Sequence, residues 1–169
     1  MRIFFIGYMF SGKTTLGKKV AAKLSLPFVD LDQYFESKYK TSILSFFEKF
    51  DETLFRKLES ETLKEVIDTH DDVLVSTGGG TACFYDNMAL MKKSGLSVYV
   101  EMSLNSILRR MYDSKKKRPL LVNVPENEME SFVEQHLEER KAYYLQADMK
   151  VKGENANVQE LVYLILNTI

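Results

Sequence analysis

Residues 7–14 read Gly-Tyr-Met-Phe-Ser-Gly-Lys-Thr, which matches the phosphate-binding pattern G-x-x-x-x-G-K-S/T. The pattern follows a short apolar run and opens a segment with helical periodicity, which is the setting in which such a loop binds a nucleotide. An ordinary glycine turn before a helix is the alternative. The residues expected to bind the nucleotide in this stretch are Gly7, Ser11, Gly12, Lys13, Thr14 and Thr15.

Each residue type of this loop has a chemical reason to occur at its position. Glycine at position 7 permits a tight exit from the strand, and Gly12 lets backbone N–H groups surround the phosphates at a helix N-terminus. Lys13 can reach the β- and γ-phosphate oxygens, and the hydroxyl of Thr14 can ligate Mg²⁺. Phe10 is bulky for a loop that brings its backbone close to a ligand. We expect Phe10 to have a negative φ, with its ring outside the phosphate cradle.

Phosphoryl transfer also needs an acceptor site, a carboxylate near the metal and a cation for the transition state. Asp30 ends an expected strand and Asp32 lies two residues further on. In an open α/β sheet the C-terminal ends of the strands face the ligand crevice, so these carboxylates could serve Mg²⁺ and an acceptor hydroxyl. The alternative for Asp32 is a helix N-cap.

Two later segments add candidates. Arg56 and Glu59 are three residues apart and can pair on one helix face, although such a pair is usually solvated. Gly78, Gly79 and Gly80 directly follow an expected strand. Three successive glycines cost chain entropy and indicate backbone pressed against a ligand, with a flexible turn as the alternative.

Two further arginines come from the second half of the chain. Arg118 stands before Pro119 in the basic stretch 114–121, which suits a lid over the nucleotide. Such a charge run can also be a solvated face or a localisation signal. Arg140 lies on an expected long helix, where most arginines are surface residues, so its candidacy rests on context.

Composition sets the class of protein. The chain has 169 residues, 45% of them hydrophobic and 28% charged, with a net charge of −1. This predicts one globular domain with no global attraction to nucleic acid or to an anionic membrane. Cys83 is the single cysteine, so an intrachain disulfide and a zinc cluster are not expected. We expect Cys83 to be a packing residue and the protein to be cytoplasmic, with no membrane span.

The elements that position these residues alternate along the chain. The pattern predicts strands at 2–6, 27–30, 73–76, 96–101 and 149–152, and helices at 13–24, over most of 31–70, and at 84–94, 103–112, 126–146 and 158–167. The prediction is one α/β domain over 1–169, with three α/β/α layers around a five-stranded parallel sheet.

Taken together, the motifs resemble those of shikimate kinase, a member of the P-loop nucleoside-monophosphate-kinase-like group. The resemblance covers nearly the full chain. The phosphate loop is shared by many families, whereas the succession D-x-D, F-R-x-x-E, G-G-G and R-P-L-L is more specific. The segments that carry it are GYMFSGKTT, DLD followed by Phe35-Glu36, FRKLE, STGGG, RRMYDSKKKRPLL and ER-x-x-YY-x-x-AD at 139–148.

The resemblance implies transfer of the γ-phosphate of ATP to the 3-hydroxyl of shikimate, giving shikimate 3-phosphate and ADP in the pathway to chorismate and aromatic amino acids. On the nucleotide side it implies that Lys13 holds the phosphates, that Thr14 ligates Mg²⁺ and that Asp30 acts near the metal through water. It places Arg118 at the γ-phosphate, in a lid over about 112–124. Arg110 is placed beside the adenine.

On the acceptor side, the resemblance implies a helical substrate-binding region at about 31–60. Asp32 bonds the shikimate hydroxyls and accepts the proton, so the catalytic set is Lys13, Asp32 and Arg118. Arg56 and Arg140 clamp the carboxylate, which matches the planar guanidinium. The triple glycine contacts the substrate through its backbone. The enzyme is expected to be a monomer.

The chain departs from the family in three places. Phe10 replaces a usual Gly, Asn87-Met88 replaces a usual Asn-Arg, and the lid is rich in Lys where Gly is usual. Two other functions remain open: a kinase of another hydroxy acid such as gluconate, and a catalytically weak nucleotide-binding module that regulates a partner.

Overall fold

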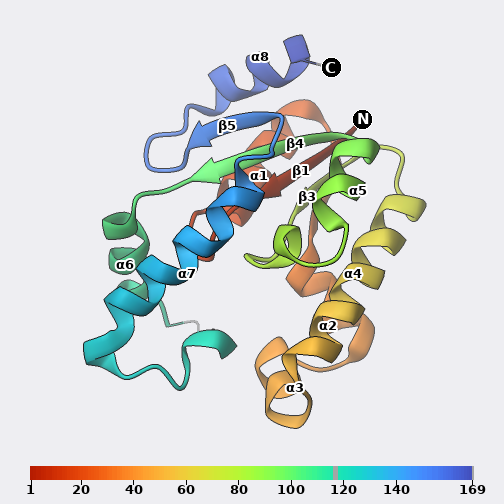
Figure 1. Cartoon of the computed structure of the whole chain (residues 1–169). Helices are drawn as coiled ribbons and strands as arrows, with labels where there is room; N and C mark the ends of the chain where they lie inside the picture. Colours follow the sequence, from red (N-terminus) through yellow and green to blue (C-terminus); the bar gives the residue numbers. More distant parts are fainter. Residues whose placement is uncertain (116–117, 169) are drawn as a thin grey trace.

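The computed structural model describes residues 1–115 and 118–168, in which strands and helices alternate (Figure 1). The strands are β1 (Arg2–Ile6), β2 (Phe28–Asp30), β3 (Val73–Ser76), β4 (Leu96–Glu101) and β5 (Met149–Lys152). The helices are α1 (Lys13–Leu24), α2 (Leu31–Tyr39), α3 (Ile43–Lys49), α4 (Glu52–Thr69), α5 (Asn87–Ser94), α6 (Leu104–Asp113), α7 (Met129–Tyr144) and α8 (Val158–Thr168). Short 3₁₀ turns are η1 (Thr81–Cys83), η2 (Pro119–Leu121) and η3 (Glu126–Glu128).

The five strands form one parallel sheet in the order β2-β3-β1-β4-β5. Strand β1 lies in the centre, where Ile3 pairs with Leu74 of β3 on one side and with Leu96 of β4 on the other. The predicted five-stranded parallel sheet is therefore confirmed. The phosphate loop leaves the C-terminal end of the central strand, between the elements that carry the other candidates.

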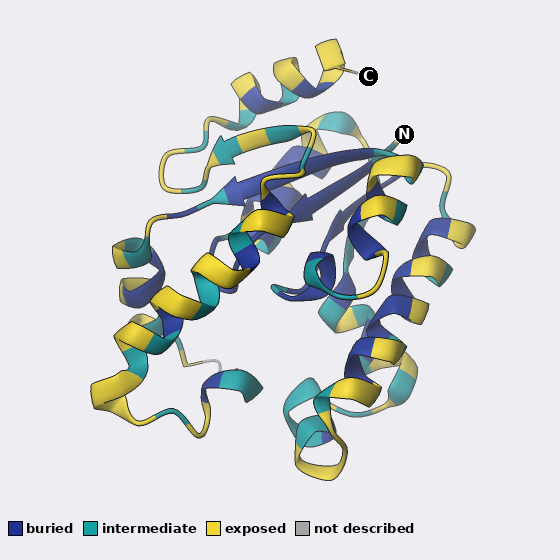
Figure 2. Ribbon diagram, viewed as in Figure 1, coloured by how far each residue is buried: buried dark blue, intermediate teal, exposed yellow. Residues whose placement is uncertain are grey.

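Alternate residues of β1 enter different cores, because successive side chains of a strand point to opposite faces. Ile3 and Phe5 pack with α1 and α8, whereas Phe4 and Ile6 pack with α4, α5, α6 and α7. Figure 2 shows the buried central strands between helices whose outer faces are exposed. This is the predicted three-layer α/β/α arrangement. Among the described residues, none of the helices is both long enough and apolar enough to span a membrane.

The region 31–60 is helical as predicted, and a separate cluster of Phe35, Phe46 and Phe55 joins α2, α3 and α4. In Figure 1 these helices stand at one side of the C-terminal edge of the sheet, and α6 and the start of α7 stand at the other. The lid predicted for 112–124 includes Lys116 and Lys117, which lie outside the described residues. The domain predicted for 1–169 includes Ile169, which also lies outside them.

Two predicted helix boundaries were wrong. The helix predicted from residue 84 begins at Asn87, because the 3₁₀ turn η1 precedes it and Tyr85 has a φ of 50°, which an α-helix does not accommodate. The helix predicted from residue 126 begins at Met129, after the 3₁₀ turn η3. Gly95 does end α5: its N–H donates to the carbonyl of Met91, and a Cβ there would collide with the carbonyl oxygen of Arg2.

Candidate active site

The phosphate loop has the backbone that its sequence predicts at both glycines. Gly7 has a φ of 141° and Gly12 a φ of 90°, values that favour glycine. Lys13 is buried, and its Nζ donates to the carbonyl oxygens of Gly7 and Tyr8, each at 2.8 Å. Burial and, to a smaller extent, the charge of Arg118 lower the pKa of Lys13 to about 7, although the nearby carboxylates oppose the change. Lys13 is thus held against the loop.

The prediction for Phe10 was wrong in its backbone. Phe10 has a φ of 64°, in the left-handed region, and its carbonyl oxygen accepts a hydrogen bond from Nη1 of Arg110 at 3.2 Å. The turn from Tyr8 to Ser11 imposes this conformation, since the N–H of Ser11 donates to the carbonyl of Tyr8. The ring faces Arg118, whose Cζ lies 5.3 Å from the ring centroid.

Thr14 and Asp30 form an oxygen-rich corner beside the loop. The hydroxyl of Thr14 donates to Oδ2 of Asp30 at 2.7 Å and lies 3.3 Å from the hydroxyl of Ser76. Asp30, and not Asp32, is the N-cap of α2, because its Oδ1 accepts from the N–H of Gln33 at 3.2 Å. Hydroxyl and carboxylate oxygens are suitable ligands for a hard divalent cation such as Mg²⁺.

No group of three or more His, Cys, Asp or Glu that could hold a metal occurs within 1–115 and 118–168. A cation held by one protein hydroxyl, nearby carboxylate oxygens, substrate phosphates and water needs no such group. The oxygen atoms around Thr14 therefore fit a metal bound together with a nucleotide.

Helix α4 carries a buried ion pair toward the sheet. Nη1 of Arg56 donates to Oε2 of Glu59 at 2.9 Å, and both side chains are almost fully buried, so this is not the solvated pair that its spacing alone favours. Nε and Nη2 of Arg56 donate to Oε1 of Glu52, each at 3.0 Å. Burial raises the pKa of Glu59, while the charge of Arg56 and the hydroxyl of Thr81 oppose the rise.

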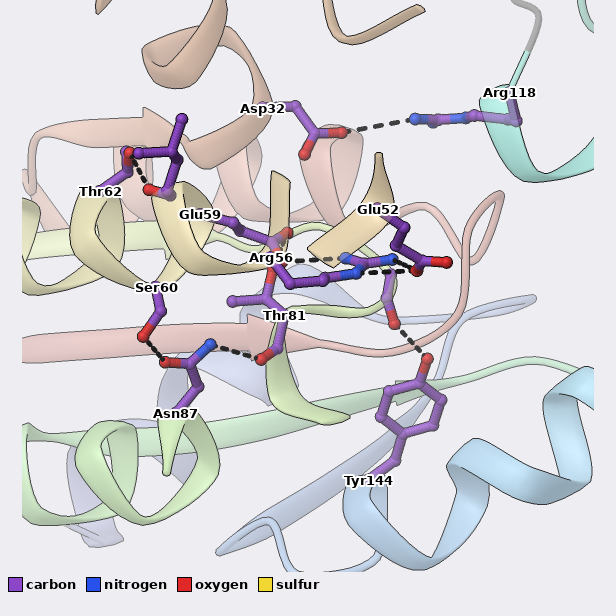
Figure 3. A network of polar contacts seen from close by, with 12 residues as sticks. Asp32, Glu52, Arg56, Glu59, Ser60, Thr62, Thr81, Asn87, Arg118 and Tyr144 are labelled. Atoms are coloured by element: carbon purple, nitrogen blue, oxygen red, sulfur yellow. Dashed lines mark hydrogen bonds and ion pairs between the residues drawn. The ribbon is translucent and has the colours of Figure 1, made fainter. Parts of the chain in front are cut away.

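A chain of hydrogen bonds supports this pair (Figure 3). The hydroxyl of Thr81 donates to Oε1 of Glu59 at 2.7 Å, and the side-chain amide of Asn87 donates to the carbonyl of Thr81 at 2.9 Å. Ser60 completes the chain by donating to Oδ1 of Asn87 at 2.7 Å. Met88 is buried in the core nearby. Asn87 thus supports the turn after the triple glycine in this chain.

Gly78 and Gly80 make room for the side chains of the site, and Gly79 makes room for the backbone of Met9. A Cβ on Gly80 would lie 2.5 Å from Nη1 of Arg56, and one on Gly78 would lie 2.8 Å from Oε1 of Glu59 and 2.9 Å from Oδ1 of Asp32. The close approach that their sequence indicates is therefore present, but in this structure the partners belong to the protein: charged groups for Gly78 and Gly80, and backbone for Gly79.

Arg140 lies on the face of α7 that packs toward the triple glycine. It is 5% exposed, and its Nη1 is buried without a hydrogen-bond partner among the described residues. One turn further on, the buried hydroxyl of Tyr144 donates to the carbonyl of Gly79. Arg140 is thus not a surface residue, and one of its donors remains available to a ligand.

Two cavities meet in the middle of these groups. One of about 410 Å³ is lined by every residue predicted to bind the acceptor: Asp32, Arg56, Gly78, Gly79, Gly80 and Arg140. The other, of about 280 Å³, is lined by Gly12, Lys13, Thr14, Thr15, Asp30 and Arg110. Asp32 and Arg118 line both, with Nη1 of Arg118 3.4 Å from Oδ2 of Asp32. Gly7 and Ser11 line neither cavity. They instead contact Nζ of Lys13, through the carbonyl oxygen of Gly7 and the hydroxyl of Ser11.

Sequence reasoning did not single out Glu52 or Tyr144. Glu52 was detectable, because it precedes Arg56 by four residues and this spacing places two side chains on one helix face. Tyr144 lies in the segment 139–148 that carries the family resemblance, but its hydrogen bond to a backbone carbonyl 65 positions away had no local signal.

This arrangement defines a class of protein. A phosphate loop that opens onto a carboxylate and an arginine, beside a cavity with two buried arginines, is the site of a P-loop kinase that phosphorylates a small anionic acceptor.

Comparisons with known proteins narrow the class. The family model for shikimate kinase matches residues 9–169. The shikimate kinase of Parabacteroides distasonis is 38% identical over 168 residues, covering 99% of this chain and 96% of that protein.

Solved structures agree. A crystal structure of shikimate kinase from Bacteroides thetaiotaomicron has a TM-score of 0.89 at 37% identity, covering 99% of this chain and 97% of that one. Shikimate kinase from Acinetobacter baumannii in complex with shikimate has a TM-score of 0.87 at 30% identity, covering 99% and 91%.

The chain belongs to the shikimate kinase family. It is an ATP-dependent kinase that transfers the γ-phosphate of ATP to the 3-hydroxyl of shikimate, in the pathway to chorismate and aromatic amino acids. The gluconate-kinase and regulatory-module alternatives are thereby set aside.

Proposed function

We propose that Asp32 is the general base of this shikimate kinase and that Arg118 neutralises the transferring phosphoryl group. The observation that carries this proposal is that Asp32 and Arg118 line both cavities and lie 3.4 Å apart. The 3-hydroxyl oxygen forms a bond to the γ-phosphorus while the bond to the β–γ bridging oxygen breaks. The proton of the 3-hydroxyl passes to a carboxylate oxygen of Asp32, and ADP leaves.

Arg56 and Arg140 hold the carboxylate of shikimate in this proposal. Arg140 has a buried Nη1 that no described residue pairs, and a buried donor of this kind is satisfied by an anionic ligand. Arg56 is held in place by Glu52 and Glu59, so its guanidinium needs little rearrangement when the substrate arrives. The backbone of Gly78, Gly79 and Gly80 closes the cavity behind the ring.

On the nucleotide side, Lys13 exchanges the carbonyls of Gly7 and Tyr8 for phosphate oxygens, and its low pKa rises toward the ordinary value when the anion arrives. Thr14 and Asp30 hold Mg²⁺, Asp30 through water, and this ion when bound offsets negative charge on the phosphates. The backbone around Gly12 and Thr15 binds the phosphates, and Arg110 lies beside the adenine.

We propose that the enzyme is a cytoplasmic monomer and a single kinase domain over 1–169, with its acceptor-binding region at 31–60. Every group assigned above to the acceptor, the nucleotide and the metal belongs to the same chain, and a monomer is the simplest arrangement that contains them. Cys83 is partly buried, and burial raises the pKa of its thiol, which suits a packing residue in a reducing compartment.

A coupled assay of ADP release tests these assignments, with Mg²⁺ and ATP and with shikimate, gluconate or no acceptor. In the presence of ATP, wild-type protein should release ADP with shikimate, but not with gluconate or without an acceptor. Asp32→Asn should lower kcat by about 10²- to 10⁴-fold, the usual contribution of a general base, while nucleotide binding persists. Asp68→Asn is the matched control, because Asp68 is exposed on α4. A normal kcat for Asp32→Asn would remove Asp32 as the base.

A further inference from the structure

Phe10 has an unusual backbone for its residue type. A φ of 64° is uncommon for bulky residues, and such a conformation persists only where the surroundings hold it. Here Arg110 holds the carbonyl of Phe10 at 3.2 Å, and the N–H of Ser11 closes the turn on Tyr8 at 3.2 Å. Glycine would suit this backbone better. Because glycine would remove this strain, the presence of Phe at position 10 suggests that its side chain has a function.

The contacts of the ring show what that function is. The ring is partly buried against the core cluster that contains Phe4 and Ile6, and its centroid lies 5.3 Å from Cζ of Arg118. The same guanidinium contacts Asp32 through Nη1 at 3.4 Å. An aromatic ring within about 6 Å attracts a guanidinium through its negative face. Arg118 is therefore held by the ring of Phe10 and by the carboxylate of Asp32, at the place where the two cavities meet.

We propose that Phe10 is a positioning residue for phosphoryl transfer, which holds the guanidinium of Arg118 at the junction of the two cavities. The proposal rests on the proposed role of Arg118. The left-handed backbone directs the ring of Phe10 toward Arg118, and the strain of that backbone is the penalty for the contact. The phosphate loop of this chain then does more than bind phosphate through its backbone, because it also orients the cation that comes from the segment after α6.

Three substitutions separate the ring from the backbone. Phe10→Leu keeps an apolar side chain in the same strained conformation but has no aromatic face. Phe10→Tyr keeps the face, and Phe10→Gly removes both the ring and the strain. We expect kcat at saturating ATP and shikimate to fall about fivefold in Phe10→Leu and in Phe10→Gly, the size of one cation–π contact. Phe10→Tyr should stay within about twofold of wild type, and KM for shikimate should change little in all three.

Thermal unfolding adds a readout that a purely structural role would not reproduce. Phe10→Gly should have a higher Tm than Phe10→Leu, because glycine accepts a positive φ without strain. Its kcat should nevertheless stay as low as that of Phe10→Leu. If kcat instead followed Tm across the set, so that Phe10→Gly were the more active, the ring would have no positioning role.

A double-mutant cycle with Arg118→Ala tests whether the ring acts through Arg118. We expect Phe10→Leu to have no further effect on kcat in the Arg118→Ala background. A fivefold loss that persists in that background would overturn the proposal. Loss of kcat in Arg118→Ala with none in Phe10→Leu would overturn it while leaving the proposed function intact. A normal kcat in Arg118→Ala would overturn the role of Arg118 itself, and the positioning role with it.

Discussion

The phosphate loop and the acceptor cavity are both proposed to bind anions, but they offer different chemical groups to them. The loop draws on backbone groups and one buried cation, Lys13, all within nine consecutive residues at 7–15. The acceptor cavity draws on charged side chains from α2, α4 and α7 and on the backbone of the glycine loop after β3. A loop of the first kind fits any nucleoside triphosphate, whereas side chains gathered from several elements can match one acceptor. Specificity therefore belongs to the second region.

The two regions also prepare their charges differently. Among the described residues, Nζ of Lys13 bonds to two neutral carbonyls and a hydroxyl, and burial is the largest cause of its pKa of about 7. Arg56 is paired by Glu52 and Glu59 before any substrate arrives. The loop is thus prepared to change its charge on binding, and the acceptor cavity is prepared to keep its charge. Three predictions test this contrast.

The largest effect is expected from the buried pair of the acceptor region. Glu59→Gln leaves Arg56 charged and almost buried beside a neutral side chain, so the free energy of unfolding should fall by roughly 3 kcal/mol. Glu52→Gln should cost less than about 1 kcal/mol, because Glu52 is 41% exposed. Urea unfolding of both variants measures the difference. Equal losses would mean that the burial of Glu59 adds nothing to the stability that its pair with Arg56 provides.

A smaller effect should follow from Arg140→Ala. Loss of a charge-assisted hydrogen bond to the shikimate carboxylate should raise KM for shikimate by about 10- to 100-fold and change KM for ATP little. Lys141→Ala is the control, since the side chain of Lys141 is 44% exposed on the same helix and makes only a 3.6 Å contact with Glu138. Steady-state kinetics with each substrate varied measures both constants. An unchanged KM for shikimate would remove Arg140 from the carboxylate site.

The smallest effect is a proton taken up by the phosphate loop. Since the pKa of Lys13 is about 7 in the free protein, much of it is neutral at pH 8.5, and phosphate oxygens favour its charged form. ATP binding should therefore take up a fraction of a proton at pH 8.5 and weaken as the pH rises above about 7. Titration calorimetry in two buffers of different ionisation enthalpy measures the uptake.

The control for this uptake is the same titration at pH 6, where Lys13 is already protonated and should take up much less. Lys13→Ala should abolish the uptake at pH 8.5. Identical binding enthalpies in the two buffers at pH 8.5 would show that the loop does not change its charge on binding.

The order of strands and helices was predictable because it depends on local periodicity. Strands β4 and β5 were predicted with the bounds that the structure has, since each is a short apolar or alternating run between turn residues. The start of α5 was mispredicted, because a 3₁₀ turn and the positive φ of Tyr85 leave no periodic signal. The candidates of the acceptor cavity were predicted by type, and the spacing of Arg56 and Glu59 indicated that they can pair. The burial of that pair and the second partner of Arg56, Glu52, were not predicted.

By itself the sequence determined the parallel α/β sheet, the phosphate loop at the end of its first strand and the types of the groups that surround it. These follow from properties of neighbouring residues. Only the tertiary structure decided that Arg56 is doubly paired, that Arg140 has a buried donor without a partner in the described part of the chain, and that Phe10 adopts a left-handed backbone. The reason is that these features depend on contacts between distant segments, as between Arg110 and the carbonyl of Phe10, 100 positions apart.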